Sequence, residues 1–278
     1  MKKSCASTLE PEPVSDGIAS STPAPTGRKG EVILRVDDLV VAYGKAEVVH
    51  GVSFEVHAGE FVVILGRNGA GKSTTLQAVS ALIPKRSGRV EFLGQDLSDA
   101  KATTIVEAGL VHVLEGHRVF HALSVEENLL IGTWASRARG DRSKLDRIYA
   151  LFPEMAERRH LAASRLSGGQ QQILAVAVGV IAEPRLLMLD EPSMGLAPLV
   201  ITRILEAVAA LCREGMAILL VEQMVETALH FADYGYLIET GRIAAAGDAD
   251  AIRQSEVLSH VYLGRHTEAA QPVIEDRP

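Results

Sequence analysis

The stretch Gly-Arg-Asn-Gly-Ala-Gly-Lys-Ser at residues 66–73 follows the continuous apolar run Phe61–Leu65 and precedes a helix-like segment. It matches the pattern G-x-x-x-x-G-K-[ST], in which a glycine-rich loop joins a buried strand to a helix. Glycine lacks the β-carbon that would keep the backbone away from a polyphosphate, so successive N–H groups can point at its oxygens. The stretch therefore predicts an α/β fold organised around a phosphate-binding loop.

The side chains of this phosphate loop have separate roles. Lys72 supplies a mobile cation for the β- and γ-phosphates, and the Ser73 hydroxyl is placed to ligate Mg²⁺. The helix that begins near Lys72 adds the positive end of its dipole. We therefore expect ATP and Mg²⁺ as cofactors, with the nucleotide held by Gly66, Arg67, Asn68, Gly69, Ala70, Gly71, Lys72, Ser73 and Thr74. The alternative is a glycine-rich turn that binds nothing.

A second apolar run, Leu186–Leu189, ends in the acidic pair Asp190 and Glu191. The carboxyl ends of parallel strands meet at the sheet edge where ligands bind, so Asp190 is expected beside the phosphates as a Mg²⁺ ligand, directly or through water. Glu191 points elsewhere and can polarise an attacking water as general base. The alternative is an ordinary acidic pair at a helix N-terminus, ahead of Pro192.

The segment Leu-Ser-Gly-Gly-Gln at 166–170 is followed by the apolar helix Ile173–Ile181. With the other two motifs, in this order, it resembles the ATP-binding cassette family over residues 31–262. The resemblance implies that two cassettes close face to face around two nucleotides. It also implies contact with the γ-phosphate held by a partner subunit, through Ser167, Gly168, Gly169 and Gln170, where a helix N-terminus offers free N–H groups.

Three further positions follow from this resemblance. Tyr43 stands where the family places a ring that stacks on adenine; the alternative is an ordinary core tyrosine. Glu115 replaces the usual Gln that reaches Mg²⁺ and the attacking water. Gln223 replaces the usual His that contacts the γ-phosphate, and Ala197 stands where many members have Asp. We expect hydrolysis to persist, because Glu can ligate Mg²⁺ and Gln can donate a hydrogen bond.

Longer matches narrow the resemblance. They are Glu-Gly-x-Arg-Val-Phe at 115–120, Ser-Val-Glu-Glu-Asn-Leu at 124–129, Glu-Pro-Ser-x-Gly-Leu-Ala-Pro at 191–198 and Val-Glu-Gln at 221–223. They closely resemble the second ATPase subunit of bacterial branched-chain amino acid importers. That resemblance implies a distinct sister ATPase, with a homodimer as the alternative. It also implies two membrane-spanning permease subunits, an extracytoplasmic solute-binding protein and a peripheral location on the cytoplasmic face of the inner membrane.

The surface that meets the permeases is expected near Glu115–Asn128, where the alternative is a plain surface loop. Two other functions stay open. The chain could serve an importer of urea or short-chain amides, because the transported molecule never touches the ATPase. From a different class, it could be a soluble cassette ATPase in assembly or repair.

Composition excludes several classes of protein. The chain has 278 residues, 47% of them hydrophobic, which is enough for a sizeable core. A formal net charge of -7 gives no electrostatic footprint for nucleic acid. The two cysteines, Cys5 and Cys212, indicate no disulfide framework. No uninterrupted apolar stretch approaches the ~18–20 residues needed to cross a bilayer.

The pattern along the chain predicts an ABC domain over 31–265 between a disordered N-terminal extension at 1–30 and a flexible tail at 266–278. We expect a mixed, mainly parallel core sheet, an antiparallel β subdomain and an inserted helical subdomain at about 95–165. Strands are expected at 32–36, 52–56, 61–65, 89–93, 109–114, 186–190 and 217–221, and helices at 72–82, 169–182 and 198–213. Tyr234–Ala246 is expected to form a hairpin.

Overall fold

The computed structural model describes residue 28, residues 30–135 and residues 140–263. The predicted disordered extension therefore lies outside the described residues except at positions 28 and 30. The predicted C-terminal tail, 266–278, lies wholly outside them. None of the described helices is both long and apolar enough to span a bilayer.

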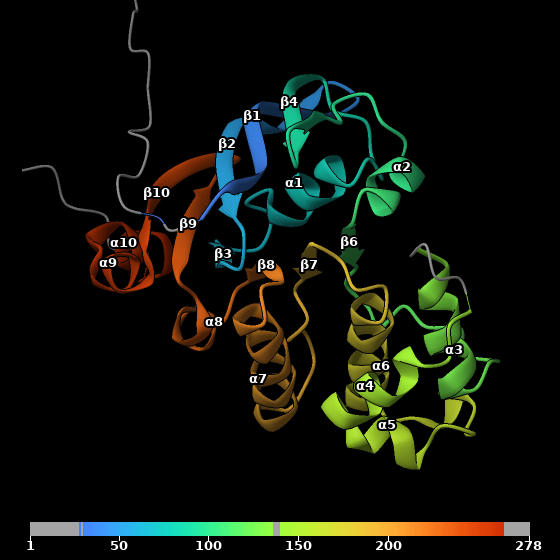
Figure 1. The fold of residues 1–278 in the computed structure, drawn as a ribbon. Coiled ribbons are helices and arrows are strands. Elements are labelled where there is room, and N and C mark those ends of the chain that lie inside the picture. The colour runs from blue at the N-terminus through green and yellow to red at the C-terminus, as the bar shows by residue number, and fades with distance from the viewer. Residues whose placement is uncertain (1–27, 29, 136–139, 264–278) are drawn as a thin grey trace, which may run out of the picture.

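The centre of the molecule is a six-stranded sheet (Figure 1). Its order is β10 (Arg242–Asp248), β9 (Tyr234–Glu239), β3 (Phe61–Leu65), β8 (Ala217–Glu222), β7 (Leu186–Asp190) and β6 (Leu110–Val113). Neighbouring strands are parallel except for the antiparallel β9–β10 hairpin. The register sets Leu65 opposite Glu222 and Asp190 opposite Val221, so β3, β7 and β8 end at the same level.

Alternation along β3 explains why this sheet is buried on both faces. Phe61 and Val63 belong to a core cluster shared with helices α6 (Gly168–Val180) and α7 (Pro198–Arg213). Val62 and Ile64 belong to a second cluster on the opposite face, because successive strand residues point to opposite sides. A five-residue run without polar residues is what such a strand requires.

The second core cluster is closed by α1 (Lys72–Val79) and a smaller antiparallel sheet. That sheet has the order β2 (Ala46–His57), β1 (Val32–Tyr43), β4 (Ser87–Phe92) and β5 (Gln95–Asp96). β1 and β2 are longer than the strands expected at 32–36 and 52–56. Register shifts interrupt their pairing, one of them between Val36 and Leu39, and these shifts obscure the alternation of the sequence by which a strand is recognised. The expected antiparallel β subdomain is present.

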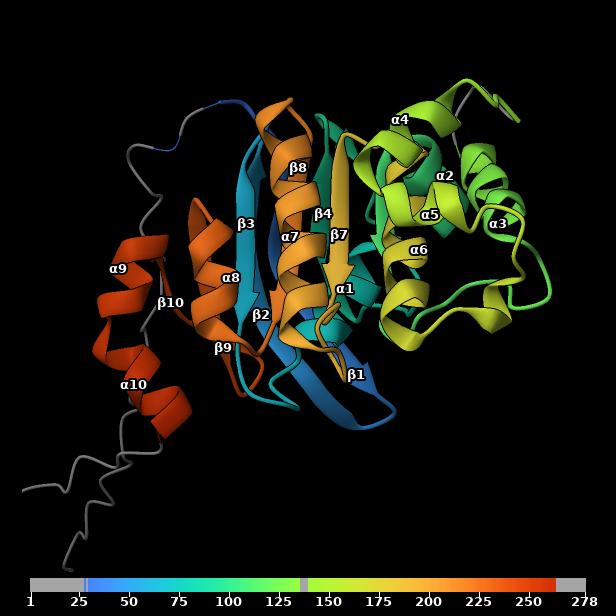
Figure 2. The ribbon, with the colours of Figure 1, turned by 90° about the horizontal axis from the view of Figure 1, so that it is seen from below.

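The helices on the other side of the central sheet form two groups (Figures 1 and 2). α6, α7 and α8 (Val225–Phe231) pack on the sheet. A helical lobe lies beside α6 and contains α3 (Val125–Gly132), η1 (Thr133–Ala135), α4 (Lys144–Leu151), α5 (Pro153–Glu157) and η2 (Ala163–Arg165). α9 (Ala249–Gln254) and α10 (Glu256–Leu263) lie beside the β9–β10 hairpin.

The structure corrects the start of the inserted helical subdomain, expected at about 95. β5 pairs with β4, and β6 pairs with β7 at the edge of the central sheet. Between them, α2 (Ala102–Glu107) contributes the buried Ile105 to the core cluster of that sheet. The helical lobe therefore begins at α3, because the apolar residues before it complete the sheets rather than the lobe.

Four predicted elements match the structure in type and position. The expected strands 61–65 and 186–190, the helix 198–213 and the hairpin at Tyr234–Ala246 agree with the structure. The helix expected at 72–82 stops at Val79, and Ala81 follows with a left-handed φ of 53°. A left-handed residue cannot continue an α-helix.

Candidate nucleotide-binding site

The phosphate loop leaves β3 at Leu65, enters α1 at Lys72 and packs tightly against neighbouring backbone. A β-carbon on Gly66 would overlap the carbonyl oxygen of Ile238 in β9. Gly71 has a φ of 100°, and a β-carbon there would lie 3.2 Å from the carbonyl oxygen of Val48. Both positions require glycine, one for space and the other for backbone conformation as well.

The Lys72 ammonium is buried and fully engaged by protein oxygens. It donates to the carbonyl oxygens of Gly66 at 2.9 Å and Arg67 at 3.1 Å. It also forms an ion pair of 3.0 Å with Glu191 Oε1. A phosphate that binds in this loop must therefore take the ammonium away from Glu191.

Glu191 lies between the ammonium of Lys72 and the side-chain amide of Gln223. Its Oε1 pairs with Lys72, and its Oε2 accepts a hydrogen bond from Gln223 Nε2. Its φ of 42° is left-handed, which costs a non-glycine residue about 1–2 kcal/mol. The structure thus brings together the three residues predicted to be catalytic.

Asp190 has the environment expected of a cation ligand. Ser73 Oγ donates to its Oδ1 at 2.8 Å, while its Oδ2 is buried without a hydrogen-bond partner among the described residues. Burial raises the pKa of Asp190 to about 6; the Ser73 hydrogen bond and Lys72 oppose the rise, and the charges of Glu191 and Glu115 add to it. A bound cation would stabilise the ionised form of Asp190 against burial and against the charges of Glu191 and Glu115.

The Ser73 hydroxyl and the free Asp190 oxygen suit a hard cation such as Mg²⁺. Across the described residues, no group of three or more His, Cys, Asp or Glu side chains is arranged to hold a metal ion. That fits Mg²⁺, which usually keeps several waters and binds through one or two carboxylates plus substrate phosphates.

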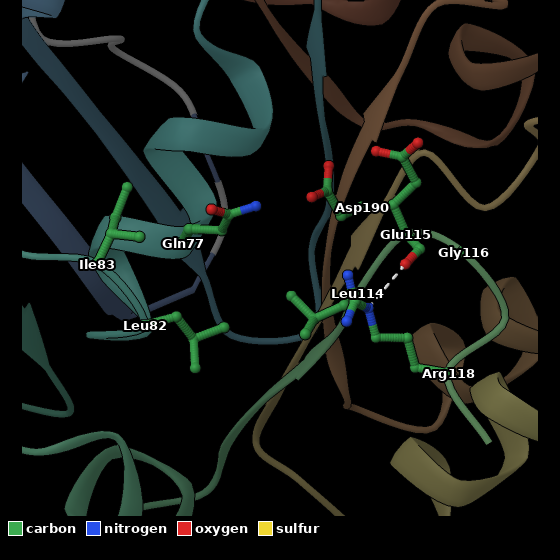
Figure 3. A pocket seen from close by; sticks show the side chains of 8 residues that line it. All are labelled: Gln77, Leu82, Ile83, Leu114, Glu115, Gly116, Arg118 and Asp190. Carbon is green, nitrogen blue, oxygen red and sulfur yellow. Dashed lines mark hydrogen bonds between the residues drawn. The ribbon is translucent and has the colours of Figure 1, made fainter. Parts of the chain in front are cut away.

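Glu115 lies at the start of a loop that follows β6, and we call residues 114–124 the Glu115 loop. Figure 3 shows its side chain next to Asp190, with Gln77 of α1 across the pocket. Arg118 Nε donates to the Glu115 carbonyl oxygen at 3.2 Å. The pocket is lined by Gln77, Leu82, Ile83, Leu114, Glu115, Gly116, Arg118 and Asp190. Glu115 thus lies within reach of the acidic site.

Tyr43 ends β1 and is 52% exposed. It pairs with Ala46 on β2, two residues from Val48, whose carbonyl oxygen approaches Gly71. An exposed ring next to the phosphate loop can stack on a base, whereas the alternative of a core tyrosine is wrong.

Residues 167–170 form a separate group, which we call the signature turn. Ser167 caps α6, because its N–H donates to Gln170 Oε1 at 3.0 Å while its Oγ accepts from the Gln170 N–H at 3.3 Å. Within the described residues, no hydrogen bond or ion pair joins the signature turn to the phosphate loop. The signature turn is therefore not tied to the phosphate loop by a polar contact among these residues.

The sequence analysis missed two residues near Glu191. Glu222 is buried at the end of β8 and accepts from the Ser193 N–H at 3.0 Å, from Ser193 Oγ at 2.6 Å and from the Gln223 N–H at 3.1 Å. Burial raises its pKa. It holds the loop that follows Glu191, and an acid at the end of an apolar strand was a signal that could have identified it.

The second missed residue is Tyr262 of α10. Its hydroxyl is buried without a hydrogen-bond partner among the described residues. Burial raises the pKa of Tyr262 to about 12; the neighbouring Gly66 backbone opposes the rise, and the charges of Glu191 and Glu222 add to it. No local pattern marks this tyrosine, because α10 reaches the site only through the fold.

Comparisons with known proteins identify the family. Residues 49–194 match the family model described as ABC transporter. The chain is 39% identical to the high-affinity branched-chain amino acid transport ATP-binding protein BraG of Pseudomonas aeruginosa, over 84% of this chain and 100% of that protein. It is 30% identical to a probable branched-chain amino acid transport ATP-binding protein, LivF, of Archaeoglobus fulgidus, over 84% of this chain and 99% of that protein.

Among solved structures, an ATP-binding cassette of an ABC transporter in its ADP conformation superposes with a TM-score of 0.74. The two chains are 24% identical, and the match covers 84% of this chain and 100% of the other. At this identity the likeness concerns the fold.

Proposed function

Because this chain belongs to the ABC transporter family and is one of its ATP-hydrolysing cassettes, we propose that it energises the import of branched-chain amino acids. The main support is its similarity over 84% of its length to a bacterial subunit of such a transport system. The segments at 115–120, 124–129, 191–198 and 221–223 point the same way. The proposed cassette spans residues 31–265.

In the proposed mechanism, ATP binding exchanges the partners of Lys72. The ammonium leaves Glu191, 3.0 Å away, and turns to the β- and γ-phosphates. Glu191 keeps its hydrogen bond from Gln223 and is then free to accept a proton from the attacking water. Ser73, Asp190 and Glu115 would hold Mg²⁺, which would neutralise phosphate charge. Tyr43 would stack on the adenine.

The signature turn is proposed to complete the site of a second cassette. Its small residues and the N-terminus of α6 suit a phosphate. Among the described residues, no hydrogen bond or ion pair joins them to this chain's own phosphate loop. We propose a distinct sister ATPase as the second cassette, with a homodimer as the alternative. ATP binding then favours the closed pair, and hydrolysis favours the open one.

The surface near Glu115–Asn128, which includes most of the Glu115 loop, is proposed to dock on the permease, and the proposed transporter contains two membrane-spanning permease subunits. Phe120 on this loop is 58% exposed, although Asn128 of α3 fixes its backbone through bonds of 2.7 Å and 3.0 Å. A large apolar side chain held outward on a fixed backbone suits a protein partner. The chain would thus act peripherally at the cytoplasmic face of the inner membrane, served indirectly by an extracytoplasmic solute-binding protein and without nucleic acid.

Uptake by the native host tests this proposal. Deleting the gene should abolish high-affinity uptake of labelled leucine, isoleucine and valine, and the wild-type gene should restore it. The Lys72→Ala gene should not restore it, which ties uptake to ATP. Unchanged leucine uptake together with lost uptake of urea or acetamide would reassign the substrate. Unchanged uptake of all these solutes would favour a soluble role instead.

A further inference from the structure

His117 joins the Glu115 loop to the first turn of α6. Its Nδ1 lies 2.7 Å from Oε1 of Gln172, a side chain that is almost fully buried in α6. Its Nε2 lies 3.7 Å from the position that a β-carbon on Gly168 would occupy. The imidazole therefore contacts α6 at Gln172 and lies beside the signature turn at Gly168.

The backbone at His117 is strained. Gly116 has a φ of 91° and His117 a φ of 52°, so two successive residues are left-handed. Only the second costs energy, because glycine adopts this conformation freely and histidine does not. Strained residues of this kind persist where the surroundings hold them and are concentrated at functional sites.

The same loop also reaches this chain's own acidic site. Glu115 lies only two residues before His117, so their Cα atoms are at most about 7 Å apart. The Glu115 side chain lies next to Asp190 (Figure 3), and its charge contributes to the raised pKa of that residue. Further along, Asn128 holds the backbone of Phe120. His117 lies between Glu115 and the fixed Phe120 on a short segment, so a displacement of Glu115 can carry His117 with it.

We propose that His117 is a positioning residue that transmits the nucleotide occupancy of this chain's own site to its signature turn. When Glu115 engages the nucleotide and its cation, the loop shifts, and His117 carries the first turn of α6 with it. The signature turn then takes the position in which it completes the neighbouring cassette's site. This inference rests on the proposed function, because it assumes that the signature turn serves a second cassette.

Hydrogen–deuterium exchange of the full chain without nucleotide tests the contact itself. His117→Ala should speed exchange of the α6 amides at 170–173 by about fivefold, because one side-chain hydrogen bond and its packing are lost. His117→Asn should restore slow exchange, because its amide can still donate to Gln172. His230→Ala is the control, at an exposed histidine of α8 outside this loop that should change nothing. Wild-type exchange in His117→Ala would overturn the proposal.

Added MgATP tests transmission. In the wild type it should change exchange at 166–173, and in His117→Ala that response should disappear while ATP still binds with unchanged affinity. In steady-state kinetics of the assembled pair of cassettes, kcat should fall about tenfold and the KM for ATP should stay within about twofold, because the phosphate loop is untouched. Gln172→Ala should show the same split, and the double variant should be no worse than either single one. Equal loss of affinity and kcat would overturn the proposal.

The two proposals fail in different ways. If the wild-type chain binds no ATP, the proposed function fails, and the exchange measured without nucleotide still decides whether His117 holds α6. If ATP binds and α6 responds equally in wild type and His117→Ala, the proposed function survives and the role of His117 is rejected.

Discussion

The phosphate loop and the signature turn both lie at a helix N-terminus, but their polar groups are satisfied differently. At the phosphate loop, Lys72 is buried and paired with Glu191, a residue far along the chain. At the signature turn, Ser167 and Gln170 satisfy each other locally. The phosphate loop is held by tertiary contacts from several strands. The signature turn is held by a helix cap, and α6 is held by the contact of His117 with Gln172.

We propose that this difference explains why the phosphate loop binds nucleotide within one chain and the signature turn acts on the nucleotide of a second cassette. The ion pair between Lys72 and Glu191 keeps the buried ammonium compensated until phosphate replaces the carboxylate, since a buried unpaired charge is costly. The signature turn carries no charge of its own and offers only N–H groups and small residues. It should therefore affect hydrolysis without affecting the stability of its own chain.

Lys72→Ala should give the largest effect on the phosphate-loop side. Hydrolysis should fall by more than about 100-fold and nucleotide binding should be lost, because the cation for the phosphates is gone and Glu191 is left without its ion partner. Fluorescent-nucleotide titration and steady-state ATPase assays measure both. Lys101→Ala, at an exposed lysine, is the control. Wild-type affinity in Lys72→Ala would remove the phosphate loop from the site.

Glu191→Gln should separate binding from chemistry at the same end. ATP should still bind, while single-turnover hydrolysis should slow by about 10²–10⁴-fold, the usual contribution of a general base. The neutral amide keeps the shape of the side chain but cannot take a proton. Undiminished hydrolysis would show that Glu191 is not the base.

His112 of β6 allows a test of how the stability of the central sheet depends on pH. Burial lowers its pKa from 6.5 to about 4, and its Nδ1 contacts Ser80 Oγ at 2.9 Å. The folded state thus disfavours the charged ring, so the stabilising contribution is complete above pH 6.5 and is lost as the pH falls towards 4. The loss should approach about 3 kcal/mol.

Urea denaturation at several pH values measures this loss. His112→Asn keeps a donor for Ser80 but cannot titrate, so its stability should depend less on pH between 4 and 6.5. Equal pH dependence in the wild type and His112→Asn would show that another group dominates acid sensitivity.

A pair of glycine substitutions compares the two ends directly. Gly66→Ala should lower the free energy of unfolding by about 1–3 kcal/mol, because the new β-carbon overlaps the Ile238 carbonyl oxygen. Gly168→Ala should leave stability unchanged or slightly higher, because the nearest atom is 3.7 Å away and alanine favours helix. Nonetheless, Gly168→Ala should lower ATP hydrolysis by the assembled pair. Normal hydrolysis in that variant would argue against a role for the signature turn.

Gln223→His should give the smallest effect. A ring nitrogen can donate to Glu191 as the amide does, so hydrolysis should change by less than about threefold. Steady-state ATPase assays decide this. Complete loss of activity would show that the amide has a role beyond this hydrogen bond.

The sequence alone located the phosphate loop, the acidic strand end and the helix behind the signature turn. In each case the chemistry depends on residues close together in the chain, such as the glycines around Ala70 or the cap formed by Ser167 and Gln170. It also predicted Phe61–Leu65 and Leu186–Asp190 correctly, because a strand buried on both faces needs an unbroken apolar run. It failed at the start of the helical lobe, where β6 was assigned to the insertion.

The partners of the charged groups were decided only by the tertiary structure. Three polar contacts join residues from separate elements. They are the ion pair of Lys72 with Glu191, the hydrogen bond from Ser193 to Glu222, and the contact of His117 with Gln172. These pairs depend on strand order and on the common level at which β3, β7 and β8 end. Local patterns state which face of a strand is buried, but not which strand lies next to it, because sheet order is set by packing across the whole domain.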